Sequence, residues 1–160
     1  MFRIGDTVIY PQHGAAVVER FQEREVSGEV RKYMVLRVTY GDLTLMVPAD
    51  STREVGLRPV TPAEQIDDVL GVLSDHACEE PTANWSRRFK ANIEKLASGD
   101  IFSVAEVVRD LTSREHDRGL SAGEKRMLSR ARQILVSELC ITAGCGDDKA
   151  MRMIDDVLEA

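Results

Sequence analysis

The fold is decided by the stretch Leu57-Arg58-Pro59-Val60-Thr61-Pro62-Ala63-Glu64, where the spacing of apolar residues changes. Before it, apolar and polar residues alternate between turn signals, which is typical of strands. After it, the apolar residues follow the i, i+3, i+4, i+7 spacing of a helix. Thr61 and Glu64 fit a capping box, with Pro62 at the first helical position. We therefore predict an α+β protein of two small domains, residues 1–58 and 61–160.

The first 58 residues predict several short strands joined by tight turns. Ser27-Gly28 and Gly41-Asp42 are the turn signals. Between them, the alternation of Met34, Leu36 and Val38 with their neighbours places these three side chains on one face. The pattern is typical of a Tudor-like or SH3-like antiparallel β-barrel, or of a small, strongly bent sheet. The open edges of such a sheet can accept a strand from a partner.

The rest of the chain predicts an all-α bundle of about five helices. The helix that begins at residue 61 is interrupted at Glu79-Glu80-Pro81. Four further helices are expected to begin near Asn84, Asp100, Ser121 and Asp147, with Asp147 as the cap of the last one. Ser121 and Glu124 form a second capping-box pattern. On the helix that follows Asn84, we expect a stripe facing the core, made of Phe89, Ile93 and Leu96.

The net charge of -6 conceals one basic region. Residues 81–132 carry eleven Lys or Arg against seven Asp or Glu, whereas residues 59–80 carry six acids and no Lys or Arg. The local sign of charge matters more than the total for selecting an anionic partner. The sequence contains no signal-peptide pattern and no apolar run of the length that a membrane span needs, so we expect a cytoplasmic protein. The three cysteines are expected to be reduced thiols.

The basic region begins at Asn84-Trp85-Ser86-Arg87-Arg88-Phe89-Lys90, around the only tryptophan. If Asn84 caps a helix, Trp85 lies in its first turn, where free N–H groups favour phosphates. An indole offers a stacking face, and the cations beside it suit phosphates. Alternatively, Trp85 packs on Phe89 at the edge of the core and the arginines form a solvated helix face. The residues alone leave both interpretations open.

A second basic cluster follows Ser121 and comprises Lys125, Arg126, Arg130 and Arg132. Arg126 and Arg130 are four apart on a helix and repel each other unless an anion bridges them. The alternative is again a solvated helix face. Cys140 and Cys145 do not have a zinc-ligand spacing, and none of the common catalytic motifs is present. We therefore expect neither an enzyme, nor a metal site, nor a cofactor.

Three motifs, in order along the chain, resemble the CarD/CdnL family of bacterial regulators that bind RNA polymerase. They are residues 4–14 (IGDTVIYPQHG), residues 80–90 (EPTANWSRRFK) and residues 120–126 (LSAGEKR). The resemblance covers essentially the whole chain and is closest to actinobacterial members. It implies an N-terminal Tudor-like domain that docks on the polymerase β subunit. It also implies a C-terminal helical domain that touches promoter DNA and stabilises the open complex, notably at ribosomal RNA promoters.

The resemblance also implies roles for individual residues. Trp85 would wedge into the minor groove at the upstream edge of the transcription bubble. The expected DNA contacts beside it are Arg87, Arg88, Lys90, Lys125 and Arg126. The expected polymerase contacts are Arg24, Val26 and Met46, although Met46 stands where family members carry an arginine. We expect a monomer with no membrane partner. The alternative function is a protein-interaction adaptor of the transcription machinery that makes no direct DNA contact, with Trp85 buried between the domains.

Overall fold

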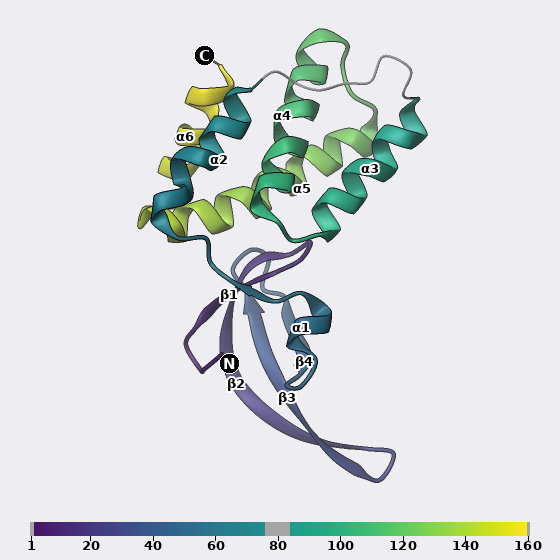
Figure 1. Ribbon diagram of the computed structural model, residues 1–160. Coiled ribbons are helices and arrows are strands. Elements are labelled where there is room, and N and C mark those ends of the chain that lie inside the picture. The colour runs from purple at the N-terminus through teal and green to yellow at the C-terminus, as the bar shows by residue number, and fades with distance from the viewer. Residues whose placement is uncertain (1, 76–83, 160) are drawn as a thin grey trace.

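The computed structural model describes residues 2–75 and 84–159. Figure 1 shows helices gathered at one end of the molecule and a long β-hairpin extending from the other end. The predicted interruption at Glu79-Glu80-Pro81 lies outside the described residues. Within the described residues, the predicted α+β architecture is confirmed, with strands in the N-terminal half and helices in the C-terminal half.

The N-terminal half is an antiparallel sheet of five described strands in the order β4-β3-β2-β1-β5. The strands are β1 (Thr7–Tyr10), β2 (Gly14–Val26), β3 (Glu29–Val38), β4 (Thr44–Pro48) and β5 (Arg58–Pro59), and a short helix α1 (Thr52–Val55) precedes β5. Both predicted turns are confirmed. Ser27 and Gly28 have positive φ angles of 53° and 82°, as a tight hairpin turn requires. The sequence pattern did not predict the short helix α1.

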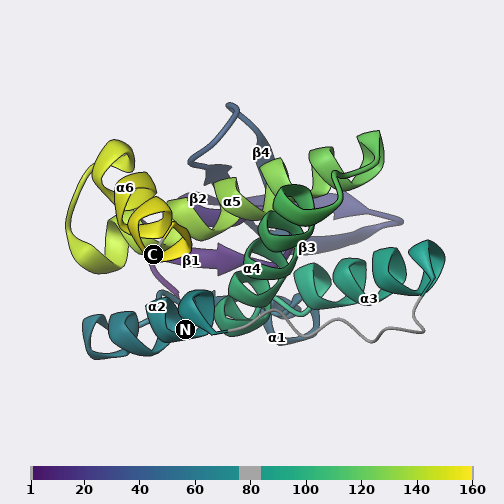
Figure 2. The ribbon, with the colours of Figure 1, turned by 90° about the horizontal axis from the view of Figure 1, so that it is seen from above.

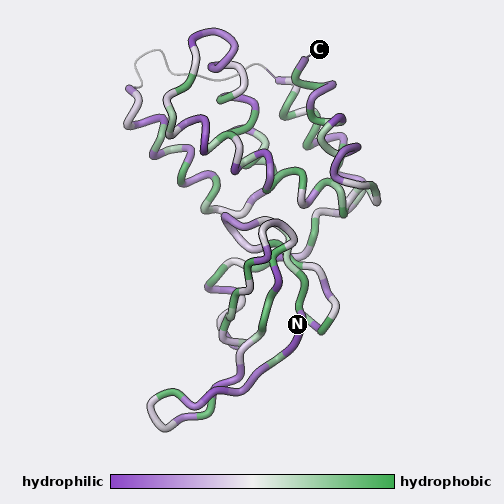
Figure 3. Tube along the Cα trace, turned by 180° about the vertical axis from the view of Figure 1, so that it is seen from behind, coloured by the Kyte–Doolittle hydropathy of each residue, from purple (hydrophilic) through white to green (hydrophobic). Residues whose placement is uncertain are grey.

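The sheet packs its own apolar core. Met34, Leu36 and Val38 all lie in it, as the alternation predicted. Val35, on the opposite face, is also fully buried, so both faces of β3 are covered at this level. Further out, residues 23–32 of β2 and β3 pair as strands only with each other. We call this two-stranded segment the hairpin arm. Figure 3 shows hydrophilic residues along it, with hydrophobic residues returning near its tip.

The C-terminal half packs five described α-helices around a second core. They are α2 (Ile66–Ser74), preceded by the 3₁₀ turn η1 (Ala63–Gln65), α3 (Trp85–Ala97), α4 (Ile101–Asp117), α5 (Ala122–Ala143) and α6 (Asp147–Leu158). The longest helix, α5, contributes buried residues along most of its length and also contacts β2. Figure 2 shows α5 running across the sheet, with α4 above it. The core of this half therefore reaches the end of the sheet.

Three of the predicted helix starts are confirmed by their caps. The side chains of Asn84 and Asp100 accept hydrogen bonds from the first turns of α3 and α4, and Ser121 and Glu124 form the reciprocal capping box of α5. Two predictions are wrong. Thr61 does not cap a helix, because its side chain bonds elsewhere, and Pro62 stands at the N-cap of η1. Asp147 is the first residue of α6 rather than its cap.

The predicted core face of α3 is also partly wrong. Leu96 is buried and Phe89 is half-buried, but Ile93 is 45% exposed and Asn92 takes the buried position. The two residues differ by about 100° around the helix axis. The core therefore lies on the Asn92 side of the stripe, and Ile93 is left at the margin between α3 and α5.

Candidate nucleic-acid interface

Trp85 is half-exposed and fixed in place. Its indole stacks on Phe89, with ring centroids 4.8 Å apart and an interplanar angle of 18°. Its Nε1–H donates a 3.1 Å hydrogen bond to Ser121 Oγ, the N-cap of α5. The side chain still has 44% of its surface exposed. Trp85 thus packs one side of its ring on Phe89, as the second interpretation predicted, and leaves the rest of the indole facing solvent.

This contact brings two helix N-termini together. Trp85 is the first residue of α3, and Ser121 precedes the first residue of α5. Gly123 lies beside both rings, since a Cβ there would be in ordinary van der Waals contact, 3.4 Å from Phe89 Cε1 and 3.9 Å from Trp85 Cζ2. Each helix N-terminus carries about half a positive elementary charge. An anion beside Trp85 would therefore meet two positive helix ends at once.

The predicted cations differ in their surroundings. Arg87 and Lys90 on α3, and Lys125 and Arg126 on α5, are exposed. No ion pair with a carboxylate is found for these four within residues 2–75 and 84–159. Arg88 is half-buried. Four of the predicted contacts therefore carry positive charge that no described carboxylate offsets.

Two members of the second basic cluster have structural roles. Arg130 Nε donates a 3.0 Å hydrogen bond to the carbonyl of Gln12, and its Nη2 lies 3.1 Å from His13 Nδ1. Arg132 pairs with Asp155 of α6. Tertiary contacts therefore draw Arg130 to the turn between β1 and β2 and Arg132 to the neighbouring helix, although Arg130 itself stays exposed.

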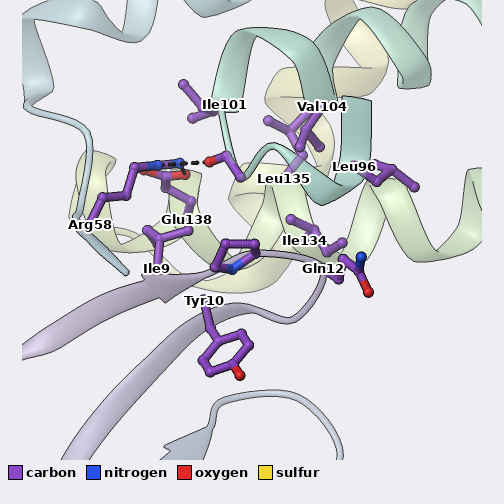
Figure 4. A pocket seen from close by; sticks show the side chains of 12 residues that line it. Ile9, Tyr10, Gln12, Arg58, Leu96, Ile101, Val104, Ile134, Leu135 and Glu138 are labelled. Carbon is purple, nitrogen blue, oxygen red and sulfur yellow. Dashed lines mark hydrogen bonds and ion pairs between the residues drawn. The ribbon is translucent and has the colours of Figure 1, made fainter. Parts of the chain in front are cut away.

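A buried polar network joins the sheet to α5 (Figure 4). The Glu138 carboxylate, with a side chain only 3% exposed, accepts two hydrogen bonds from Arg58 at 2.6 and 2.7 Å. It also accepts from the backbone N–H and the hydroxyl of Thr61, at 2.8 and 2.6 Å. Arg58 Nε donates to the carbonyl of Gly99 at 2.7 Å. The sequence analysis did not predict this network. The signal for it was an acid, Glu138, between the apolar residues Leu135 and Leu139 of α5.

The turn between β1 and β2 also joins the sheet to α5. We call this contact, together with the Glu138 network, the seam. Ala15 N–H donates to Ser137 Oγ at 3.0 Å. A Cβ at Gly14 would lie 2.4 Å from the same oxygen and 3.3 Å from Ile134 Cα, and Gly14 has a φ of 79°. Only glycine satisfies both the backbone angle and the close approach. The residues Pro11-Gln12-His13-Gly14, which end the first of the three family motifs, thus join the sheet to the helices.

The family model described as "CarD-like/TRCF RID domain" matches residues 2–61, and the model described as "CarD, C-terminal domain" matches residues 68–155. The chain belongs to the CarD-like family. The chain is also 35% identical over 144 residues to the "Putative transcription factor YdeB" of Bacillus subtilis (strain 168), with 90% of this chain and 94% of that protein covered.

A solved structure of a CarD-like protein is similar to the N-terminal half. It is the solution NMR structure of the 72-residue N-terminal domain of Myxococcus xanthus CarD, with 27% sequence identity and a TM-score of 0.32. The similarity covers 37% of this chain and 79% of that one. The two family models and the Bacillus subtilis relative confirm the resemblance to the CarD/CdnL family.

The expected polymerase contacts lie in two places on the sheet of this CarD-like chain. Arg24 and Val26 are exposed on the hairpin arm. Met46 is half-buried on the edge strand β4, where it pairs with Val35 of β3. Arg24 pairs with Arg31 of β3, and Arg31 precedes Val35 by four residues in that strand. The two places are therefore about 13 Å apart along the strand direction.

Within residues 2–75 and 84–159, no three His, Cys, Asp or Glu side chains gather closely enough to hold a metal ion. Of the helices described, none is both long enough and apolar enough to cross a membrane.

His13 is expected to make the stability of this CarD-like chain depend on pH. Burial, and then the nearby Arg130, lower the pKa of His13 below its ordinary value of 6.5. The unfolded chain therefore binds more protons than the folded chain just below pH 6.5. The contribution of His13 is complete above that pH and is lost as the pH falls through the folded-state pKa.

Urea unfolding at pH 7.5 and at pH 5.5 measures this effect. The His13→Gln variant should lose less free energy of unfolding between the two pH values than the unmodified chain does. His116→Gln, at an exposed position on α4, is the matched control. Equal losses in all three proteins would show that the His13–Arg130 contact carries no pH dependence.

Proposed function

We propose that this chain is a transcription regulator that binds RNA polymerase and promoter DNA at the same time. The N-terminal domain, residues 1–58, docks on the polymerase β subunit through Arg24, Val26 and Met46. The helical domain, residues 61–160, contacts the DNA at the upstream edge of the transcription bubble and stabilises the open complex. Membership of the CarD-like family and the similarity to a protein named as a transcription factor support the regulatory role.

The observation that carries the DNA contact is the half-exposed indole of Trp85 among uncompensated cations. Tryptophan is highly buried on average in folded proteins, so an indole that stays half-exposed among cations suits a surface that a partner covers. Here the ring is held by Phe89 and Ser121, so inserting it between bases costs little ordering of the side chain. Arg87, Lys90, Lys125 and Arg126 would meet the flanking phosphates.

The arrangement suggests a mechanism that needs no bond chemistry. Docking on polymerase raises the local concentration of the helical domain beside the DNA, so a modest basic patch suffices. The indole fills the gap at a junction that is already unstacked, which offsets a cost of a few kcal/mol. Because the chain would bind the open complex more tightly than the closed one, it shifts that equilibrium toward open.

Trp85→Ala tests the wedge. We expect the variant to fold and to bind polymerase normally, because Trp85 lies outside the seam and outside the hairpin arm. Base–aromatic stacking contributes about 1–3 kcal/mol, so the lifetime of the open complex should fall by roughly tenfold. A competitor challenge of preformed promoter complexes measures that lifetime.

The adaptor alternative makes a different prediction. An adaptor that makes no DNA contact would leave the lifetime of the Trp85→Ala complexes unchanged while still co-purifying with polymerase. This alternative placed Trp85 in a buried position between the domains. That placement is wrong, because the partners of Trp85 are Phe89 of α3 and Ser121 at the start of α5.

A further inference from the structure

Glu124 is a buried acid that the proposed mechanism leaves unused. It lies in the first turn of α5 with only 2% of its surface exposed, although its capping box with Ser121 does not require such burial. Burying a carboxylate is costly unless a partner offsets its charge. Arg114 of α4 supplies that charge, since its Nε lies 3.9 Å from Glu124 Oε2. Two helices therefore hold this carboxylate in place.

The Ser121 hydroxyl can satisfy its three neighbours in only one way. A hydroxyl has one proton to donate and two lone pairs that accept. The indole Nε1–H of Trp85 and the backbone N–H of Glu124 both donate to Ser121 Oγ, at 3.1 and 3.2 Å. Neither N–H can accept, so the hydroxyl proton points to Glu124 Oε1, which is 3.2 Å away. The carboxylate therefore fixes the rotation of the hydroxyl and leaves a lone pair facing the indole.

The orientation of the indole thus depends on groups that lie beyond its own contacts. Arg114 places its charge beside Glu124, and Glu124 orients the hydroxyl that accepts from the ring. The stack on Phe89 constrains only the face of the ring, whereas the hydrogen bond to Ser121 fixes how the ring is turned within its plane. Together the two contacts leave the exposed part of Trp85 in one orientation.

We propose that Glu124 is a positioning residue for Trp85, which it holds through the Ser121 hydroxyl, and that Arg114 supports Glu124 from α4. The inference rests on the proposed insertion of Trp85 at the bubble edge and deepens it, because it names what sets the orientation of the inserted ring. A ring held in advance loses less freedom on insertion than a ring that is ordered only then. If Glu124 served only as a cap, it would stabilise α5 and leave the indole unaffected.

Glu124→Met tests the proposal, because methionine keeps the length of the side chain and offers no oxygen to the hydroxyl. Trp85 is the only tryptophan, so tryptophan fluorescence of the full chain reports on this ring alone. We expect Glu124→Met to lower the fluorescence anisotropy and to increase quenching by acrylamide. The lifetime of the open complex should shorten roughly threefold, which is the effect of losing one hydrogen bond.

Other variants separate positioning from capping. Asp100→Ala removes the cap of α4 and should lower stability without changing the fluorescence of Trp85. Ser121→Ala, at an exposed position, removes the acceptor itself and should change the fluorescence as Glu124→Met does, whereas Ser121→Thr keeps the hydroxyl and should not. Adding Glu124→Met to Ser121→Ala should change it no further, because Glu124 acts through the hydroxyl. If Glu124→Met does not fold, Glu124→Gln replaces it and should have the same effects at smaller size, since its one oxygen cannot serve both Ser121 and Arg114.

The outcomes distinguish this proposal from the proposed function. Unchanged Trp85 fluorescence in the Glu124 variant would overturn the proposal, as would an effect that adds in full to that of Ser121→Ala. It is also overturned if the ring is loosened and the open-complex lifetime is kept, while Trp85→Ala shortens that lifetime. If the ring is loosened and neither the Glu124 variant nor Trp85→Ala shortens the lifetime, the positioning stands and the proposed function fails.

Discussion

Replacing Glu138 with alanine is expected to cause the largest loss of stability of any single change in the seam. Four hydrogen bonds converge on its buried carboxylate, two from Arg58 and two from Thr61. The substitution leaves the Arg58 guanidinium without its counter-charge and the N–H and hydroxyl of Thr61 without an acceptor. Removing one partner of a buried ion pair costs about 3–5 kcal/mol.

Chemical denaturation followed by circular dichroism measures this loss. Glu106→Ala is the matched control, because Glu106 pairs with Lys95 at 2.9 Å within the helical half and both side chains are about one-third exposed. An exposed pair of that kind contributes about 0–1 kcal/mol. Glu138→Gln should fall between the two, since its amide oxygen can still accept from Thr61. Equal losses for Glu138→Ala and Glu106→Ala would contradict the stabilising role of the seam.

The same network explains why one prediction from the sequence was wrong. Thr61 and Glu64 have the spacing of a capping box, and the local pattern gives no reason to doubt it. The hydroxyl of Thr61 instead reaches Glu138, which is 77 residues away in the sequence. A hydrogen bond to a charged acceptor is stronger than a neutral cap. Local spacing cannot reveal a competitor that only the tertiary fold brings near.

Features that depend on neighbouring residues were predicted well. The turn at Ser27-Gly28 and the caps at Asn84 and Ser121 were confirmed, because each is fixed by the backbone within three or four residues. The spacing of Ile93 placed it on the apolar side of α3 but could not say where α5 would lie. The indole of Trp85 was ambiguous for the same reason, since Ser121 lies 36 residues further along the chain.

Arg24→Glu is expected to abolish co-purification with RNA polymerase. Arg24 is exposed on the hairpin arm, and its register partner is Arg31, another cation. Like charges directly opposite each other destabilise a strand pair. Arg31 has a partner in Asp50, 3.8 Å away, whereas no carboxylate among the described residues pairs with Arg24. An acidic surface on the polymerase would offset the charge of Arg24. Reversing the charge of Arg24 should lower affinity at least tenfold, because an attraction at the proposed interface becomes a repulsion.

This substitution has an advantage over most tests of an interface. The new carboxylate would face Arg31 across the strands, which is a favourable pair, so thermal unfolding should show a stability equal to or above that of the unmodified chain. Loss of binding could then not be attributed to loss of the fold. Arg152→Glu, the same change of charge at an exposed position on α6, is the control and should still bring polymerase down. Retention of polymerase by Arg24→Glu would place the docking surface away from the hairpin arm, with β4 and Met46 as the next region to test.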